Sequence, residues 1–101
     1  MNVLRVCKVS EVSEGEARSF VVGDFDLAVY NIAGKIYVTD DTCTHGPSSL
    51  SDGFIEGDTI ECPFHYGRFH IPTGQPLKFP CTIALRTYQT QTIDGELFIE
   101  T

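Results

Sequence analysis

The pattern Cys43-Thr44-His45-Gly46, followed further along the chain by Cys62-Pro63-Phe64-His65, is the most informative part of the sequence. Residues 46 to 61, which number 16, separate His45 from Cys62. Each motif supplies one thiolate and one imidazole from what reads as a tight loop, because Gly46 permits a sharp turn and Pro63 fixes one. The sequence therefore predicts that Cys43, His45, Cys62 and His65 are metal ligands that converge from two loops.

A ligand set of two cysteines and two histidines does not by itself identify the metal. A tetrahedral structural zinc site uses the same side chains. Common zinc modules, however, pair Cys with Cys and His with His, as C-x2–4-C and H-x3–5-H. Here each loop holds one of each, as C-x-H and C-x-x-H. An iron–sulfur centre is therefore favoured, and a structural zinc module stays open as an alternative.

Outside the two motifs, the chain consists of short β-rich runs broken by turns, and no segment keeps an apolar period of 3.6 residues for three turns. Asp94-Gly95 between two such runs is a hairpin signal. A turn with one helical turn is expected over residues 10–15. The expected strands are Val3 to Cys7, Ala17 to Val22, Asp26 to Asn31, Lys35 to Thr39, Phe54-Ile55, Asp58 to Glu61, Arg68 to Ile71, Ala84 to Thr92 and Glu96 to Glu100. These features predict an all-β, antiparallel sandwich or barrel.

Length and charge limit the function classes. The 101 residues suffice for one domain, and 14 acidic against 7 basic side chains give a formal net charge of −7, which excludes phosphate backbones as natural partners. No apolar run is long enough for a membrane span or a signal peptide, so we expect a cytoplasmic protein. With no secretory signal, metal binding or free thiols take precedence over disulfides for the four cysteines.

The segments from Tyr37 to Gly46 and from Gly57 to His65 resemble the Rieske motif of the ferredoxin components of bacterial aromatic-ring-hydroxylating oxygenases. The resemblance extends over essentially the whole chain. It implies one [2Fe–2S] cluster, with Cys43 and Cys62 on the inner iron and His45 and His65 on the outer iron. It also implies a β-sandwich with a small cluster-binding subdomain inserted at about residues 41–82, and a covering third loop at Phe79-Pro80-Cys81.

By the same resemblance, the protein is expected to be a monomeric electron carrier in aromatic hydrocarbon catabolism and not itself an enzyme. It would shuttle single electrons from a flavin-containing ferredoxin reductase to a terminal oxygenase. No nucleophile–base set or phosphate loop argues for catalysis. A small module of another redox enzyme, of the nitrite-reductase type, remains the alternative within the same fold.

Residues next to the expected ligands indicate the reduction potential of the cluster. High-potential Rieske proteins carry a loop disulfide and two hydroxyl donors to the cluster, and the matching positions here are Ser48 and Phe64, then Gly67 and Phe69. None of these residues can form that disulfide or donate those hydrogen bonds. The resemblance therefore implies a reduction potential near the low end of the Rieske range, roughly −150 mV.

For the remaining residues with reactive or charged side chains, a structural interpretation stands beside each functional one. His70 is expected on a strand surface or in a hydrogen bond, and Tyr66 is the first candidate for partner contact. Cys7 and Cys81 are expected to act as small hydrophobes, although a disulfide between them is conceivable. The acidic residues around the loops could be solvated or could meet a basic partner; they are Asp40, Asp41, Asp52, Glu56, Asp58 and Glu61.

Overall fold

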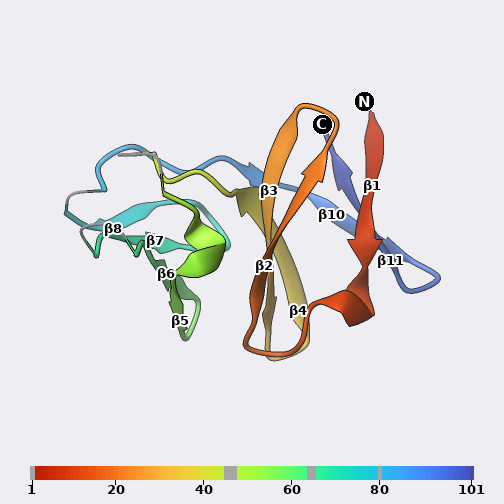
Figure 1. The fold of residues 1–101 in the computed structure, drawn as a ribbon, viewed down its shortest axis with the longest axis horizontal. Coiled ribbons are helices and arrows are strands. Elements are labelled where there is room, and N and C mark those ends of the chain that lie inside the picture. The colour runs from red at the N-terminus through yellow and green to blue at the C-terminus, as the bar shows by residue number, and fades with distance from the viewer. Residues whose placement is uncertain (1, 45–47, 64–65, 80) are drawn as a thin grey trace.

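The computed structural model describes residues 2–44, 48–63, 66–79 and 81–101, which form three antiparallel sheets (Figure 1). The elements in chain order are β1 (Val3–Lys8), η1 (Val9–Glu11), β2 (Ala17–Val22), β3 (Phe25–Ile32), β4 (Lys35–Asp40), η2 (Leu50–Asp52), β5 (Phe54–Glu56), β6 (Thr59–Glu61), β7 (Arg68–His70), β8 (Pro76–Lys78), β9 (Thr87–Tyr88), β10 (Thr90–Ile93) and β11 (Glu96–Glu100). The predicted all-β antiparallel fold is confirmed.

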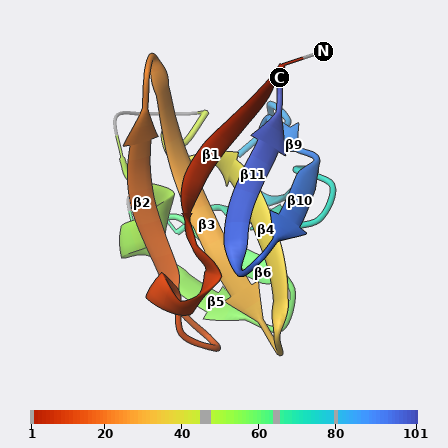
Figure 2. The same ribbon diagram turned by 90° about the vertical axis from the view of Figure 1, so that its right-hand side faces the viewer.

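Two of the sheets form the base of the molecule. One has the strand order β2-β3-β4-β9 and the other β1-β11-β10, and Figure 2 shows the second lying across β3 and β4. Side chains from both sheets fill the space between them. This base core contains Val6, Cys7, Val12, Leu27, Val29, Val38, Tyr88, Leu97 and Ile99.

The third sheet, β5-β6-β7-β8, lies beside the base as a separate lobe (Figure 1). Its strands have only three residues each. Ile60 of β6 stands opposite Phe69 of β7, and both are fully buried. The lobe core contains Ala28, Tyr30, Cys43, Leu50, Ile60, Cys62, Phe69, Ile71, Cys81 and Leu85.

Strand β3 connects the two cores. Successive side chains of a strand point to opposite faces. Leu27 and Val29 therefore enter the base core, while Ala28 and Tyr30 enter the lobe core. All four are fully buried, which explains why this strand reads as a continuous apolar run instead of an alternating one.

Two of the strand predictions were wrong. The expected strand from Ala84 to Thr92 is divided: β9 joins the β2-β3-β4 sheet, β10 joins the β1-β11 sheet, and residues 84–86 are not strand. Leu85, before β9, is buried in the lobe core, whereas Tyr88 of β9 is buried in the base core. Strand β8 was not expected, because Pro76 begins it; proline is tolerated there since β8 is an edge strand that pairs only with β7.

The short helical pieces also differ from expectation. The expected helical turn occurs slightly earlier, as η1, and η2 was not predicted. Within the described ranges, no helix is long and apolar enough to cross a membrane.

Candidate metal centre

The two candidate ligand cysteines lie together in the lobe core. Cys43 is 3% exposed and Cys62 is 0% exposed, although they are 19 positions apart in the chain. The other two predicted ligands, His45 and His65, lie outside the described residues. The structure thus brings the thiol half of the predicted site together.

Both ligand loops are closed by the same type of hydrogen bond. The backbone N–H of Cys43 donates to the carbonyl of Ser48 at 2.9 Å, and that of Cys62 donates to the carbonyl of Gly67 at 2.7 Å. Each bond spans five positions. Each cysteine is therefore fixed at its backbone N–H by a residue five positions further along the chain.

Asp41 fastens the first loop to the rest of the molecule. It is 2% exposed, and its carboxylate Oδ1 accepts a hydrogen bond from the N–H of Ser51 at 2.9 Å. Its own N–H donates to Asp26 O, and its carbonyl accepts from Leu50 N–H. The expectation that Asp41 is a solvated or partner-facing acid was wrong, because its backbone and side chain are occupied inside the protein.

Several of the other acidic residues near the loops are also paired. Asp40 accepts a hydrogen bond from the Tyr88 hydroxyl. The carboxylates of Glu56 and Glu61 lie 3.5 and 3.4 Å from the Arg68 guanidinium. The negative charge near the loops therefore has a structural role in addition to any role in docking.

His70 has the hydrogen-bonded role expected for it. Its Nε2 lies 2.9 Å from Asp58 Oδ2, and its Nδ1 lies 2.7 Å from Thr73 Oγ1. Both ring nitrogens are thus engaged on the outer side of β7.

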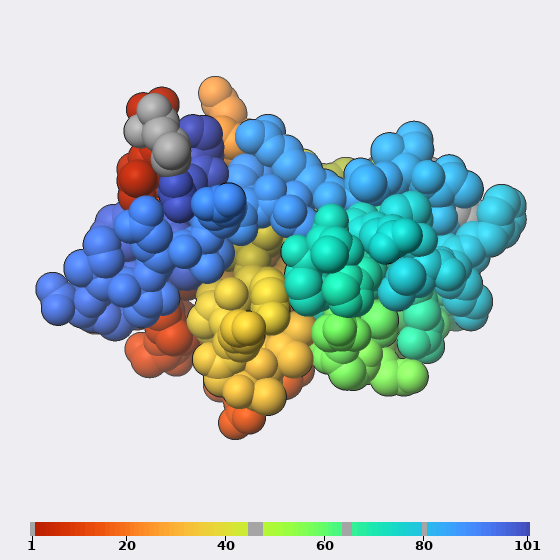
Figure 3. All heavy atoms as spheres, turned by 180° about the vertical axis from the view of Figure 1, so that it is seen from behind, coloured from red at the N-terminus to blue at the C-terminus, as the bar shows by residue number. Residues whose placement is uncertain are grey.

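The chain after β8 is hydrogen-bonded to the first ligand loop and to the turn between β7 and β8. Thr44, the residue after Cys43, donates its hydroxyl to the carbonyl of Ile83 at 2.8 Å. The N–H of Leu85 donates to the carbonyl of Gly74 at 2.7 Å, and a side chain at position 74 would come within 2.0 Å of Leu85 O. Figure 3 shows this light-blue part of the chain running from the outer end of the molecule back to the base. Nothing in the sequence indicated that Thr44 would join the first ligand loop to the segment around Ile83.

Cys81, in the covering segment, is packed among the ligand cysteines. It is 4% exposed and belongs to the same core as Cys43 and Cys62. Burial raises the pKa of the Cys81 thiol, while a side-chain hydrogen bond with Cys43 lowers it. Cys81 therefore has the buried position that its prediction as a small hydrophobe requires, and it lies in the same core as the two candidate ligand cysteines.

Cys7 is the small hydrophobe that was expected. It lies in the base core at 2% exposure, and burial raises the pKa of its thiol. Cys7 and Cys81 occupy different cores, so the disulfide that the sequence left open does not form.

Large apolar side chains are exposed at the loop end of the lobe. Tyr66 is 61% exposed, Phe79 81% and Ile83 65%. Tyr66 has a φ of 61°, in the left-handed region that residues other than glycine rarely adopt. This residue directly follows the predicted ligand His65, so its backbone is held in an unfavourable conformation beside the candidate site.

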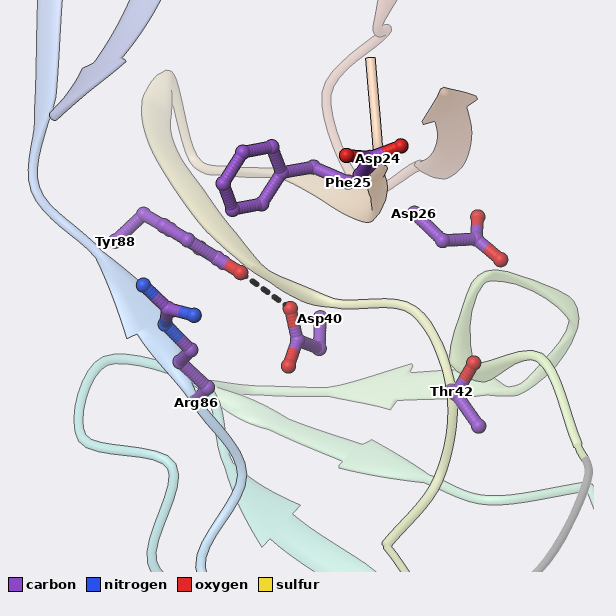
Figure 4. A pocket seen from close by; sticks show the side chains of 7 residues that line it. All are labelled: Asp24, Phe25, Asp26, Asp40, Thr42, Arg86 and Tyr88. Atoms are coloured by element: carbon purple, nitrogen blue, oxygen red, sulfur yellow. Dashed lines mark hydrogen bonds between the residues drawn. The ribbon is translucent and has the colours of Figure 1, made fainter. Parts of the chain in front are cut away.

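A separate surface hollow of about 310 Å³ lies where the base meets the lobe (Figure 4). The Arg86 guanidinium carbon lies 4.8 Å from the centre of the Tyr88 ring and 5.9 Å from that of Phe25. Tyr88 is hydrogen-bonded to Asp40 across it. The two ligand cysteines do not line the hollow.

The donor set fits a metal centre with mixed thiolate and imidazole ligands. Two buried cysteines on adjacent loops provide two thiolates, and the predicted histidines would provide two neutral donors. Among residues 2–44, 48–63, 66–79 and 81–101, no group of three or more His, Cys, Asp or Glu could hold a metal ion. Cys43, Cys62 and Cys81 therefore do not make a three-cysteine site by themselves.

Sequence comparison gives the class of this fold and site. Residues 2–89 match the Rieske [2Fe–2S] domain, and the chain therefore belongs to the Rieske family. The cofactor of that family is a [2Fe–2S] cluster, which agrees with the pair of buried cysteines found here.

More particular similarities are to ferredoxins. The chain is 45% identical over 92 residues to the ferredoxin component of the naphthalene 1,2-dioxygenase system of Pseudomonas putida, covering 91% of this chain and 88% of the relative. The solved Sphingomonas yanoikuyae B1 ferredoxin is 44% identical, with a TM-score of 0.94 and 99% coverage of both chains.

Two other solved structures bear on the partner. A chain in the complex of reduced oxygenase and oxidized ferredoxin in carbazole 1,9a-dioxygenase is 44% identical, with a TM-score of 0.88 and coverage of 96% and 91%. A putative NADPH nitrite reductase small subunit is 17% identical, with a TM-score of 0.84 and full coverage of both chains, and shares the fold alone.

Proposed function

We propose that this protein is the ferredoxin of an aromatic-ring-hydroxylating dioxygenase system. It accepts single electrons from a flavin-containing ferredoxin reductase and delivers them to a terminal oxygenase. The observation that carries this proposal is the pair of buried cysteines on two similarly closed loops, in a chain that is 44–45% identical to dioxygenase ferredoxins. The protein is an electron-transfer component, as those relatives are named, and the oxygenase performs the catalysis.

The ligand assignment is part of this proposal. Cys43 and Cys62 hold one iron, and His45 and His65 hold the other, with residues 41–82 as the cluster-binding unit of the single domain. When bound, a [2Fe–2S] cluster with this ligand set supplies a one-electron site whose potential lies above that of a four-thiolate cluster. The near-complete burial of both cysteines supports their assignment to the inner iron.

The protein's own residues exclude water and hold the loops. Leu50, Ile60 and Phe69 are fully buried beside the two cysteines and keep solvent from the sulfur atoms. Asp41 and Thr44 tie the first loop to the base and to the covering segment. A rigid surrounding of this kind lowers the structural rearrangement that accompanies electron transfer.

The exposed side chains Tyr66, Phe79 and Ile83 support docking at the loop end. Electron-transfer encounters use small and transient interfaces. A few apolar side chains around the predicted histidines would give such an interface, and the net charge of −7 would steer the protein toward a basic face of its partners. We place this exchange in the cytoplasm, where a buried thiol such as Cys7 stays reduced.

The alternative functions make different predictions. A structural zinc module would contain zinc and no iron or sulfide. A nitrite-reductase-type module would share the cluster and differ in its partner. The likeness to the putative nitrite reductase small subunit is one of fold at 17% identity, whereas the dioxygenase ferredoxins are 44–45% identical.

A single-turnover experiment tests the proposed partner. The protein is reduced with dithionite, freed of excess reductant, and mixed without air with the purified oxygenase of a naphthalene or carbazole dioxygenase system. We expect the visible spectrum of the oxygenase to show its reduction within seconds, more slowly at high salt because charge steering is screened. The control mixes the oxygenase with oxidised protein and a trace of dithionite. If the reduced protein reduces the oxygenase no faster than this control, the proposal is contradicted.

A further inference from the structure

We propose that Cys81 is a positioning residue of the metal centre, whose side chain fills the space beside Gly67 and thereby fixes the loop that carries Cys62. The inference rests on the proposed function, because it takes Cys62 as a ligand of the cluster. It goes beyond that function by giving a role to a cysteine and a glycine that lie outside the two ligand motifs.

Gly67 has no room for a side chain. A Cβ atom at this position would overlap the sulfur of Cys81, and it would lie only 3.2 Å from the backbone nitrogen and 3.3 Å from the Cβ atom of the same residue. Gly67 is buried and its φ is not positive, so its backbone conformation does not by itself require glycine. Position 67 requires glycine because the side chain of Cys81 lies against it.

Gly67 in turn holds the proposed ligand Cys62. The carbonyl of Gly67 accepts the hydrogen bond from the N–H of Cys62 at 2.7 Å, which closes the second ligand loop. A displacement of the backbone at position 67 would therefore stretch this bond or move Cys62. The contact between Cys81 and Gly67 thus acts on a ligand through a single backbone hydrogen bond.

The segment 81–85 is fixed at several points. The N–H of Cys81 donates to the carbonyl of Lys78 at 3.1 Å, and the N–H of Leu85 donates to the carbonyl of Gly74 at 2.7 Å. Between these two points, the carbonyl of Ile83 accepts the hydrogen bond from Thr44 in the first ligand loop. The backbone of Cys81 is therefore not free to move away from Gly67.

The sulfur of Cys81 has little freedom either. The Cys81 side chain is 4% exposed and lies in the lobe core with Cys43 and Cys62. Protein cores are packed closely, so a rotation of the sulfur away from Gly67 would displace other buried side chains. A side chain added at position 67 should therefore move the second ligand loop and alter the site that holds the iron.

The first test uses Gly67→Ala in the cluster-containing protein. We expect it to lose iron to a chelator roughly tenfold faster than the wild type, because residues that orient metal ligands have effects of this size. Its visible circular dichroism should also change, since that spectrum depends on the arrangement of the ligands. A role in folding alone would lower the unfolding free energy and leave the spectrum unchanged.

The second test moves the space from one side chain to the other. In Gly67→Ala combined with Cys81→Ala the overlapping sulfur is gone, and the nearest atoms of residue 81 lie at 3.2 and 3.3 Å. The double variant should therefore recover the wild-type spectrum and lose iron more slowly than Gly67→Ala. If Gly67→Ala alone does not fold, we expect the double variant to fold with its cluster. Such non-additivity indicates a direct interaction between the two positions.

Two control variants show whether this rescue is specific. Gly53 also has a negative φ, and a Cβ atom there would overlap the carbonyl oxygen of Glu61. Gly53→Ala should destabilise the protein, and Cys81→Ala should not relieve that loss. Cys7→Ala removes a buried thiol from the base core and should neither change the spectrum nor rescue Gly67→Ala.

Three outcomes would overturn the inference. They are a wild-type spectrum and rate of iron loss in Gly67→Ala, a double variant that is no better than Gly67→Ala, and loss of the cluster from Cys81→Ala alone, which would make Cys81 a ligand. We expect Cys81→Ala to keep two irons and two sulfides. Failure of the proposed function is distinguishable, because the wild-type protein itself would then contain no iron and no sulfide.

Discussion

The two cores of this molecule share strand β3 but are built in different ways. The base core is closed by β1, β3, β4 and β11, strands of five to eight residues, and is almost entirely aliphatic apart from Cys7 and Tyr88. The lobe core is closed by strands of three residues and by loops, and contains three cysteines. The difference indicates that the base supplies stability, while the lobe holds ligand geometry and depends on its loop contacts.

The largest expected effect separates the cysteines of the two cores. Cys43→Ala and Cys62→Ala should abolish cluster binding, because in the proposed ligand assignment each removes one of two thiolates on the same iron. Cys7→Ala should keep two irons and two sulfides and destabilise the fold by only about 1–2 kcal/mol, since it removes one small buried group. Iron and sulfide analysis with denaturant unfolding measures both; a Cys62→Ala protein with a full cluster would contradict the ligand assignment.

The second prediction concerns Asp41, which connects base and lobe. Asp41→Ala leaves the part-buried N–H of Ser51 without its acceptor and should cost about 1–2 kcal/mol of unfolding free energy. Asp41→Asn keeps an acceptor oxygen and should cost less. Asp52→Ala, at an exposed acid close in sequence, is the control and should change stability little. Equal stabilities for the Asp41 and Asp52 variants would show that the hydrogen bond from Ser51 to Asp41 does not stabilise the fold.

The third prediction compares two residues with the same strained backbone, one in each region. Tyr66 of the lobe has a φ of 61°, and Ala33, in the β3–β4 turn of the base, has a φ of 53°. Glycine at either position should stabilise the protein by about 1 kcal/mol, because it relieves the left-handed conformation. Only Tyr66→Gly should also slow electron transfer to an oxygenase, because only Tyr66 is exposed at the loop end. Equal transfer rates for both variants would remove Tyr66 from the docking surface.

The smallest effect is an alkaline sensitivity that involves one tyrosine in each core, Tyr88 in the base and Tyr30 in the lobe. Burial raises the pKa of Tyr88 to about 12, and burial also raises the pKa of Tyr30. Both folded-state pKa values exceed the unfolded value of 10.0. The neutral tyrosines therefore stabilise the fold fully below pH 10, and this stability is lost as the pH rises from 10 toward 12. Tyr88→Phe should flatten the decline in this window, as measured by urea unfolding, and an unchanged slope would contradict the assignment.

The sequence predicted the ligand motifs and most strands because these features are local. The runs around Ala33-Gly34 and Asp94-Gly95 pair as expected, since turn chemistry and β-branched residues act over a few positions. Positions 43 and 62 were identified as ligands from spacing and family resemblance, and the structure places both in one core.

Other features could not be predicted because they depend on contacts between distant segments. The role of Asp41 requires the positions of Asp26 and Ser51, and that of Thr44 requires Ile83, 39 positions away. The sheet change after Tyr88 depends on the pairing of β9 with β4 and of β10 with β11, strands that are distant in the sequence or separated from them by a turn. Cys81 read as a spare thiol because nothing in sequence shows that its sulfur lies against Gly67.

The central claim is that Cys43, His45, Cys62 and His65 hold a [2Fe–2S] cluster that carries one electron. The EPR spectrum of the dithionite-reduced protein tests it most directly, with iron, zinc and sulfide analysis of the same sample. We expect a rhombic signal with a low average g value, and two irons and two sulfides per chain. An EPR-silent protein with one zinc per chain and no sulfide would contradict the claim.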